Sequence, residues 1–320
     1  MKIKNREELI AKQEEYRASL NSQRKQILIC AGTGCVAGGS LEIYAKMKDI
    51  IEGKGLKCAL VLEKDPHGDS IGLKKSGCHG FCEMGPLLRI EPMGWLYIKV
   101  SLDDCEEIIE KSIIGDEVID RLVYKDQEGN PYVKQEDIPF YKQQTRIALE
   151  YCGHINAESI AEYLALGGYS AVAKALFDMT PQGIVDEITE SCLRGRGGGG
   201  FPAGRKWQQV LDQKEEEKYI VCNGDEGDPG AFMDRSMMEG EPHRVIEGML
   251  IAAIATGARH GYIYVRAEYP LAVERLQTAI DKAMDRGLLG KDILGSGFDF
   301  DLHISPVSYT HLTLPTNSRV

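Results

Sequence analysis

The chain has 320 residues, 43% of them hydrophobic, which is enough to bury sizeable cores and favours two domains. A formal net charge of −11, without runs of Lys and Arg interleaved with aromatic residues, argues against nucleic acid as a partner. No apolar run approaches the roughly 20 residues needed to cross a bilayer, and the charged N-terminus has no signal-peptide core. We therefore expect no membrane insertion and a cytoplasmic location.

The first part of the chain has the pattern of an α/β unit. Residues 1–25 hold a predicted amphipathic helix over Asn5–Leu20, with Leu9, Ile10, Tyr16 and Leu20 as its apolar contacts. Gln26–Ile29 predicts a short strand, which runs into the glycine-rich loop Cys30–Ser40. Leu41–Ile51 then predicts a helix. A strand, a cysteine-bearing loop and a helix are the opening of a thioredoxin-like unit.

Four of the nine cysteines are spaced as a ligand set. Cys30 and Cys35 flank four residues on the first loop, and Cys78 and Cys82 flank three on a second glycine-rich loop, which follows a predicted strand over Ala59–Leu62. Four thiolates on two such loops can enclose a [2Fe-2S] cluster. Structural zinc is the alternative, although zinc ribbons favour two-residue gaps. A redox-active disulfide would want Cys-x-x-Cys, which is absent.

This cysteine spacing resembles the thioredoxin-like [2Fe-2S] ferredoxin domain, over residues 26–120. A closing hairpin is predicted from Leu87–Ile90 and Trp95–Val100, and a last helix over Leu102–Ile114. Because four cysteines complete the set, His79 is expected beside the ligands or at the surface. The other cysteines are expected to be packing thiols, since a reducing compartment disfavours disulfides. Residues 121–141 are polar and turn-rich and predict a linker between domains.

A glycine-rich stretch, RGRGGGGFPAGRKW, runs from Arg194 to Trp207 after three predicted helices, 157–166, 171–177 and 181–191. Six of the ten residues from Gly195 to Gly204 are glycine. That density lets backbone approach a ligand closely and leaves N–H groups free to point at an anion such as phosphate. A flexible linker is the alternative, but linkers rarely carry a Phe-Pro pair, arginines, a lysine and a tryptophan in ordered proximity.

A second loop follows the predicted strand Tyr219–Cys222 and reads NGDEGDPG from Asn223 to Gly230. Loops at the carboxyl ends of strands are where open α/β sheets bind ligands. Taken as a bare carboxylate cluster, the loop can instead bind Mg²⁺ or Ca²⁺. Helices and strands are then predicted to alternate, at 242–256, 262–265, 271–286 and 298–304. That order implies a mostly parallel sheet.

Together these two segments resemble the flavin and NADH site of the NADH-oxidising flavoprotein subunit of respiratory complex I. Relatives of that subunit occur in NAD(P)-linked iron hydrogenases and formate dehydrogenases. The resemblance covers about residues 140–304. The resemblance implies FMN as cofactor and NAD(H) or NADP(H) as substrate. Hydride then passes between the nicotinamide and flavin N5, and electrons leave singly to iron–sulfur clusters, so no catalytic acid or base is named. Among the implied contacts, Gly198 and Phe201 face NADH, and Asp228 stands where relatives often carry Glu. The cofactor-binding residues it implies are Gly195, Arg196, Gly197, Gly198, Phe201, Lys206, Asn223, Asp225, Glu226 and Asp228.

The predicted fold class is α/β, with the thioredoxin-like [2Fe-2S] domain followed by an incomplete Rossmann-like FMN/NAD(P)H-binding domain over 142–304. The N-terminal fusion resembles the hydrogenase and formate dehydrogenase forms, since complex I tends to keep the two parts on separate chains. We therefore predict a subunit of an NAD(P)-linked hydrogenase, electron-bifurcating forms included, with the other subunits as partners. Complex I and formate dehydrogenase are the alternatives.

The resemblance stops at Ser305. Relatives continue with a Gly-Glu-Glu segment and a [4Fe-4S] domain, which are not in this chain, so 305–320 is predicted to be an artefactual tail. If the chain truly ends there, a [2Fe-2S] electron carrier that does not oxidise NADH is the second hypothesis.

Overall fold

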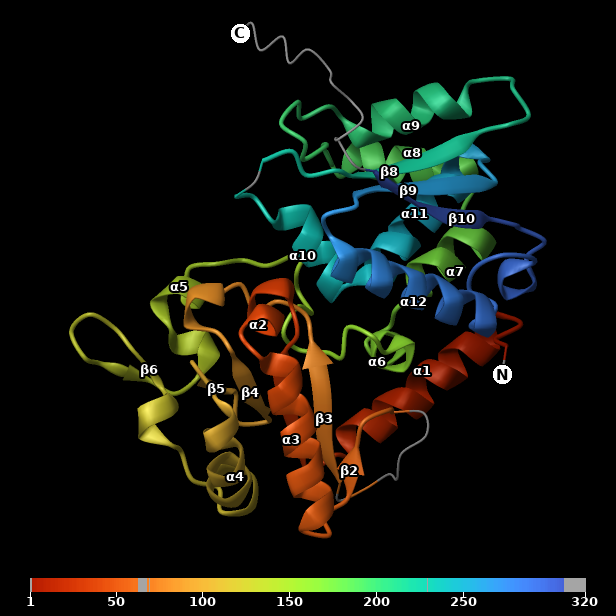
Figure 1. The fold of residues 1–320 in the computed structure, drawn as a ribbon. Helices are drawn as coiled ribbons and strands as arrows, with labels where there is room; N and C mark the ends of the chain where they lie inside the picture. Colours follow the sequence, from red (N-terminus) through yellow and green to blue (C-terminus); the bar gives the residue numbers. More distant parts are fainter. Residues whose placement is uncertain (1, 63–67, 69, 229, 308–320) are drawn as a thin grey trace, which may run out of the picture. The chain divides into compact units, whose positions relative to one another are not determined.

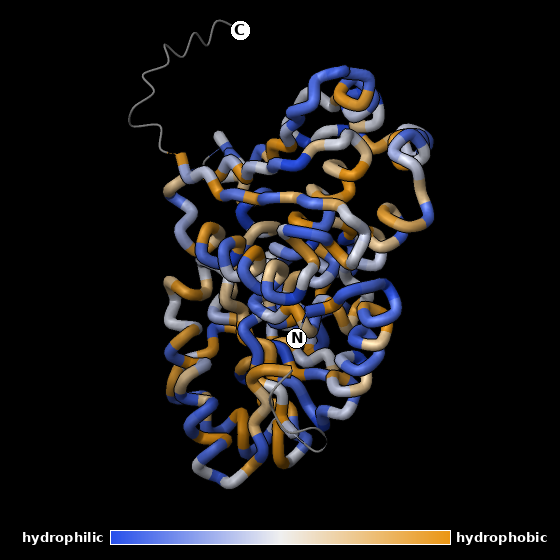
Figure 2. The backbone as a smooth tube through the Cα atoms, turned by 90° about the vertical axis from the view of Figure 1, so that its right-hand side faces the viewer, coloured by the Kyte–Doolittle hydropathy of each residue, from blue (hydrophilic) through white to orange (hydrophobic). Residues whose placement is uncertain are grey.

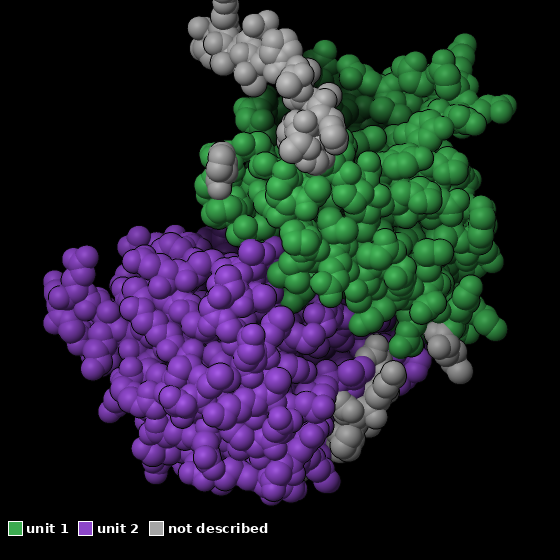
Figure 3. All heavy atoms as spheres, in the orientation of Figure 1, with its two compact units in different colours: residues 1–10, 168–238, 243–320 green, residues 11–167, 239–242 purple. Residues whose placement is uncertain are grey.

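The computed structural model describes residues 2–62, 68, 70–228 and 230–307, and the chain divides into two compact units. Unit 1 comprises residues 1–10, 168–238 and 243–320, and unit 2 comprises 11–167 and 239–242 (Figure 3). Each unit joins a β-sheet to helices, so the predicted α/β class is confirmed (Figure 1). In the described part of the chain, no helix combines the length and apolarity needed to span a membrane.

Unit 2 is built on a five-stranded sheet with the strand order β2-β3-β1-β4-β5. The strands β2, β3 and β1 are parallel, whereas β4 is antiparallel to β1 and β5 to β4. Ile27, Leu28 and Ile29 of β1 are all buried, as expected for a central strand covered on both faces. The predicted first strand and the closing hairpin are confirmed. The strands are β1 (Lys25–Cys30), β2 (Cys58–Ala59), β3 (Ile71–Ser76), β4 (Leu88–Glu91) and β5 (Trp95–Tyr97).

The strand that leads to the second cysteine loop is β3, which the sequence pattern did not predict. The expected strand over Ala59–Leu62 was wrong in extent, because β2 ends at Ala59. Lys74 and Lys75 give β3 a polar sequence, although most of the strand is buried. Lys74 is only 2% exposed, and its Nζ lies 3.0 Å from Oε2 of Glu162 and donates to Oε1 of Gln26. A charge is tolerated in this buried strand because it is paired and hydrogen-bonded.

Helices pack against this sheet and supply its core. Met47 and Ile51 of α3 and Ile109 are buried with the strand residues in one hydrophobic cluster. The predicted helix over Leu102–Ile114 is confirmed as a continuous helical stretch, formed by a 3₁₀ turn (Leu102–Asp104), α4 and a wider helical turn (Ile108–Ile114). The helices of this unit are α2 (Thr33–Ala37), α3 (Ser40–Gly53), α4 (Cys105–Glu107), α5 (Pro139–Lys142) and α6 (Ile160–Ala165).

The stretch 121–141, predicted as a linker, belongs to unit 2. It forms a small antiparallel hairpin from β6 (Tyr124–Lys125) and β7 (Pro131–Tyr132). Leu122 and Val123 join the hydrophobic cluster on the sheet. Residues 142–167 also belong to this unit, although the sequence pattern placed them in the second domain.

Unit 1 contains a three-stranded sheet in the order β10-β9-β8, and all its strands are parallel. This confirms the parallel sheet predicted from the alternation of helices and strands. Figure 2 shows hydrophobic and hydrophilic residues interleaved along the helices, as expected when one helix face meets a core. The strands are β8 (Tyr219–Gly224), β9 (His260–Arg266) and β10 (Asp301–Val307). The helices are α7 (Ser170–Phe177), α8 (Pro181–Glu190), α9 (Ala203–Leu211), α10 (Met233–Gly240), α11 (Pro242–Thr256) and α12 (Pro270–Arg286).

The two ends of the described chain match the predictions in part. The predicted N-terminal helix is α1 (Arg6–Asn21), in which Leu9 and Tyr16 are buried as expected but Ile10 is exposed. At the other end, β10 pairs with β9 as far as Val307, so it includes three residues of the stretch predicted to be a tail. Residues 308–320 lie outside the described residues.

Candidate functional site

The structure brings the four predicted cysteine ligands together in unit 2. Cys30 ends β1 and Cys35 lies in α2, while Cys78 follows β3 and Cys82 opens a 3₁₀ turn, Cys82–Met84. The sulfurs of Cys78 and Cys82 are 3.6 Å apart, and the thiol of Cys30 hydrogen-bonds with those of Cys35 and Cys78. The parallel pairing of β1 with β3 places both loops at the same edge of the sheet.

Glycines allow this close approach of the two loops. A Cβ atom added at Gly32 would lie 2.9 Å from Cβ of Cys78, and one at Gly85 would lie 2.8 Å from Sγ of Cys35. At Gly34 an added Cβ would lie 3.4 Å from Sγ of Cys82. At Gly32 and Gly85 only glycine fits without displacing a cysteine, whereas at Gly34 the contact is tight.

The thiols are crowded enough to change one another's pKa. The hydrogen bond with Cys35, together with burial, raises the pKa of Cys30 to about 12, whereas the same bond lowers the pKa of Cys35. A hydrogen bond with Cys30 also raises the pKa of Cys78 to about 11. A bound cation stabilises thiolates, so a positively charged cluster would counter these raised pKa values.

The number and pairing of the sulfurs suit two irons. A [2Fe-2S] cluster takes two cysteines on each iron, and the two loops supply four between them. All nine cysteines are free thiols, so none of the four is held in a disulfide.

His79, between Cys78 and Cys82, is buried, so the surface position considered for it is wrong. Its Nε2 lies 2.9 Å from Oγ of Ser76, and its Nδ1 lies 3.2 Å from Oε1 of Gln135. Burial lowers the pKa of His79 to about 3, which keeps the ring neutral. Both ring nitrogens are therefore engaged with polar side chains of the protein, as expected for a residue that supports the loop without binding metal.

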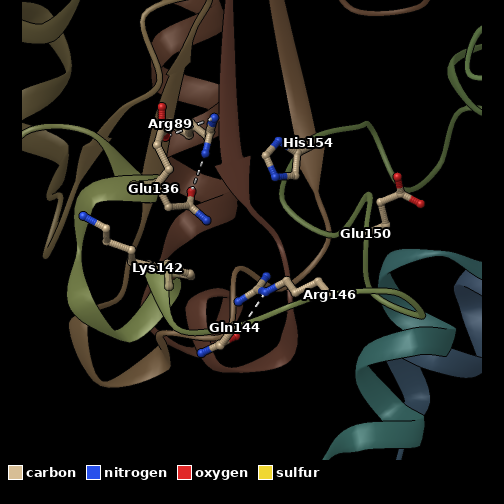
Figure 4. A pocket seen from close by; sticks show the side chains of 9 residues that line it. Arg89, Glu136, Lys142, Gln144, Arg146, Glu150 and His154 are labelled. Carbon is tan, nitrogen blue, oxygen red and sulfur yellow. Dashed lines mark hydrogen bonds and ion pairs between the residues drawn. The ribbon is translucent and has the colours of Figure 1, made fainter.

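A polar cleft of about 600 Å³ opens in unit 2 beside the second cysteine loop (Figure 4). Arg146 connects the cleft to this loop, since its Nη2 donates to the carbonyl of His79 at 2.8 Å and its guanidinium lies over the ring of Tyr141. Deeper in the cleft, Nη1 of Arg89 donates to Oε1 of Gln135. The lining residues are Arg89, Gln135, Glu136, Tyr141, Lys142, Gln144, Arg146, Glu150 and His154.

In unit 1, the glycine-rich stretch forms a closed loop between α8 and α9. Two backbone bonds close it, from the N–H of Gly195 to the carbonyl of Phe201 and from the N–H of Ala203 to the carbonyl of Leu193. A Cβ added at Gly197, 198, 199 or 200 would meet no atom within 4 Å. The loop therefore borders open space on which a ligand can lie, and Gly198, with φ +97°, has a backbone conformation that favours glycine.

The side chains predicted to act with this loop lie near its two ends. Phe201 is 41% exposed, and the cationic groups of Arg205 and Lys206 lie 5.8 and 5.9 Å from the centre of its ring. Lys206 is in the first turn of α9 and is exposed. The guanidinium of Arg196 donates back to the carbonyl of Arg194. The structure thus brings Phe201 and Lys206 together beside the glycines.

The second predicted segment follows β8, as expected. Asn223 and Asp228 each accept one backbone N–H within the loop, from Asp225 and Gly230. Glu226 is different, because it is buried and its carboxylate accepts the backbone N–H groups of Met233, Asp234 and Arg235. Glu226 therefore caps α10, a structural task that the sequence pattern did not indicate.

Two further carboxylates, Glu239 and Glu241, were missed. Both are buried and accept backbone N–H groups in unit 2, Glu239 from Thr33 on the first cysteine loop and Glu241 from Tyr151. The available signal was the run Glu239-Gly240-Glu241-Pro242, in which a glycine separates two acidic residues before a proline-started helix. Acidic residues at that place are ordinarily solvated, so the pattern alone did not single them out.

Parts of this chain are similar to known proteins. Residues 188–311 match the family described as the Nuo51 FMN-binding domain. An NADP-reducing hydrogenase subunit, HndC of Solidesulfovibrio fructosivorans, is 56% identical over 163 residues, covering 51% of this chain and 33% of that protein. An NADH-quinone oxidoreductase subunit of Rhizobium meliloti is 49% identical over 152 residues, covering 48% of this chain and 35% of that protein.

Among solved structures, an NAD⁺-reducing [NiFe]-hydrogenase in the H₂-reduced state is 21% identical with a TM-score of 0.41, covering 94% of this chain and 46% of that one. The thioredoxin-like [2Fe-2S] ferredoxin from Aquifex aeolicus is 26% identical with a TM-score of 0.26, covering 32% of this chain and 97% of that one.

The chain spans about a third of the length of the curated relatives it matches. The matched family region includes the glycine-rich loop, α9 and the loop after β8, which are the segments on which the predicted resemblance depended. That resemblance is therefore confirmed, because residues 188–311 match the family described as the Nuo51 FMN-binding domain.

Proposed function

We propose that this chain is part of an NAD(P)H:FMN oxidoreductase subunit that passes electrons between NAD(P)H, FMN and a [2Fe-2S] cluster. The observation that carries the proposal is the presence, in one chain, of four converging cysteines in unit 2 and an FMN-binding family region in unit 1. Bound FMN would supply the exchange between a two-electron nicotinamide and one-electron clusters.

Within unit 1, backbone N–H groups of the glycine loop would face the flavin phosphate or ring, because the loop borders open space. Lys206 would place a positive charge beside them, and Phe201 would offer an aromatic face to the nicotinamide. The other proposed cofactor-binding residues are Gly195, Arg196, Gly197, Gly198, Asn223, Asp225, Glu226 and Asp228. The carboxylate of Glu226 already caps α10, so we propose that its part in the site is to fix the loop that carries its neighbours.

Within unit 2, Cys30, Cys35, Cys78 and Cys82 would hold the [2Fe-2S] cluster. We also propose a cytoplasmic location, which is supported by nine free thiols and no disulfide among the described cysteines. The partners would be other subunits of a hydrogenase, since HndC is similar to about half of this chain. Complex I and formate dehydrogenase remain the alternatives for the parent assembly.

Replacing Lys206 with alanine should weaken FMN binding about tenfold or more, because a lost hydrogen bond to a charged group typically costs about 1.5–3 kcal/mol. The measurement is the FMN dissociation constant, from quenching of flavin fluorescence by the full chain. Lys214→Ala is the matched control, since it removes another exposed lysine of the same unit. Equal FMN affinity in the Lys206→Ala and Lys214→Ala variants would contradict the proposed flavin contact.

An electron carrier without NADH oxidation is the second candidate. It is favoured by one observation, that all four proposed cysteine ligands lie in unit 2 and none of them lies in the matched FMN-binding region. A chain that holds the cluster but neither binds FMN nor reduces a dye with NADH would support this reading.

A further inference from the structure

The short segment Glu239–Glu241 comprises the last two residues of α10 and the residue that precedes α11, and it belongs to unit 2. The exposed fraction is 1% for Glu239 and 2% for Glu241. Burying a carboxylate costs free energy unless hydrogen bonds compensate it. Two buried carboxylates separated by one residue therefore require specific hydrogen-bond donors.

Glu239 finds its donors on the first cysteine loop. Its Oε2 accepts the backbone N–H of Thr33 at 3.0 Å, and its Oε1 accepts the hydroxyl of the same residue. Thr33 lies between Cys30 and Cys35 and begins α2, the short helix that carries Cys35. The N-cap residue of α2, Gly32, has no side chain to cap the helix, so the carboxylate of Glu239 supplies the cap.

Gly240 touches the second cysteine loop. A Cβ added at Gly77, the residue before Cys78, would lie 2.5 Å from Cα of Gly240. A Cβ added at Gly240 would lie 2.3 Å from Sγ of the buried Cys152. The two backbones thus meet at a pair of glycines, where no larger residue fits without displacing one of the loops.

Glu241 anchors the segment from its other end. Its Oε1 accepts the backbone N–H groups of Tyr151 at 2.9 Å and Cys152 at 3.1 Å. These bonds are independent of those made by Glu239. Since the segment is fixed at both ends, it is a rigid support for the loops that it touches.

We propose that the segment Glu239–Glu241 positions the iron–sulfur site, with Glu239 as the residue that fixes the first cysteine loop and tunes the cluster's reduction potential. The inference rests on the proposed [2Fe-2S] site. It gives a segment that lies within the matched FMN-binding region a role in the geometry and potential of the cluster. Hydrogen bonding and charge around the ligands set the potential of such clusters. A nearby carboxylate favours the oxidised, more positive state, because an added electron is repelled.

The test is the midpoint potential and EPR spectrum of the cluster in the full chain carrying Glu239→Gln. We expect a more positive midpoint potential and altered g values, because the carboxylate charge is lost and one bond to Thr33 is replaced. Thr33→Val is the second variant, which keeps the charge and removes only the hydroxyl donor. It should leave the potential nearer to wild type and release iron faster to a chelator.

Glu247→Gln is the matched control, since Glu247 is another buried carboxylate that accepts backbone N–H groups, from Tyr169 and Val172, in unit 1. We expect it to leave the cluster's potential unchanged. Wild-type potential, g values and iron release in both the Glu239→Gln and the Thr33→Val chains would overturn the inference. So would a Glu247→Gln shift as large as that of Glu239→Gln. A wild-type chain that holds no cluster would instead overturn the proposed function.

Discussion

Replacing Cys78 with alanine is expected to abolish the EPR signal of the reduced [2Fe-2S] cluster and to take the iron content from about two per chain towards zero. In the proposed ligand set, the thiol of Cys78 contacts those of both Cys30 and Cys82. Its loss leaves one iron with a single cysteine. Cys78→Ser should have a smaller effect, with altered g values, since an oxygen replaces the sulfur.

Cys58→Ala is the control for this experiment. Cys58 is a free thiol in the same unit, on β2, and it is partly buried. Its loss should leave iron, sulfide and the EPR signal at wild-type levels. An unchanged signal in the Cys78→Ala chain, or equal losses in the Cys78→Ala and Cys58→Ala chains, would contradict the assigned ligand set.

Gly204→Ala is expected to destabilise unit 1 by about 1–3 kcal/mol and to weaken FMN binding with it. Gly204 lies in α9, where an added Cβ would come within 2.1 Å of Oγ1 and 2.8 Å of both Cα and N of Thr189 in α8. A rotation of the threonine side chain relieves the first contact but not the contacts with its backbone. The helix α9, which carries Lys206, must therefore move away from α8.

The measurements are the urea unfolding midpoint and the FMN dissociation constant. Gly248→Ala is the matched control, because Gly248 lies inside α11 of the same unit and an added Cβ there meets nothing within 4 Å. A glycine inside a helix costs about 0.5–1 kcal/mol relative to alanine, so this variant should be as stable as wild type or more stable. Equal stability of the two variants would show that α9 does not depend on the close contact at Gly204.

The convergence of the four proposed cysteine ligands was predictable because its information is local. Cys30 stands at the end of the predicted first strand, and the spacing within each glycine-rich loop relates its second cysteine to its first. The glycine-rich loop was predictable for the same reason, since glycine density indicates backbone that must approach something else. In both cases a few neighbouring residues determine the local structure, and tertiary packing only assembles the pieces.

What could not be predicted depends on pairs that are distant in sequence. The strand β3 has a polar pattern because the charge of Lys74 is matched by Glu162, a partner 88 positions away. The buried carboxylate of Glu239 is matched by Thr33, 206 positions away. Taken alone in the sequence, each of these residues is of a type that is ordinarily solvated at the surface. Only the folded chain shows that the charge of each side chain is compensated, because folding both buries the side chain and places it beside its partner.

The account is tested most directly by the cofactor content of the wild-type chain, purified anaerobically, reconstituted with iron and sulfide and then titrated with FMN. It predicts about two irons and two sulfides per chain, the EPR signal of a [2Fe-2S] cluster on reduction, and FMN binding at about one per chain. Bound zinc without sulfide, or the absence of FMN binding, would contradict it.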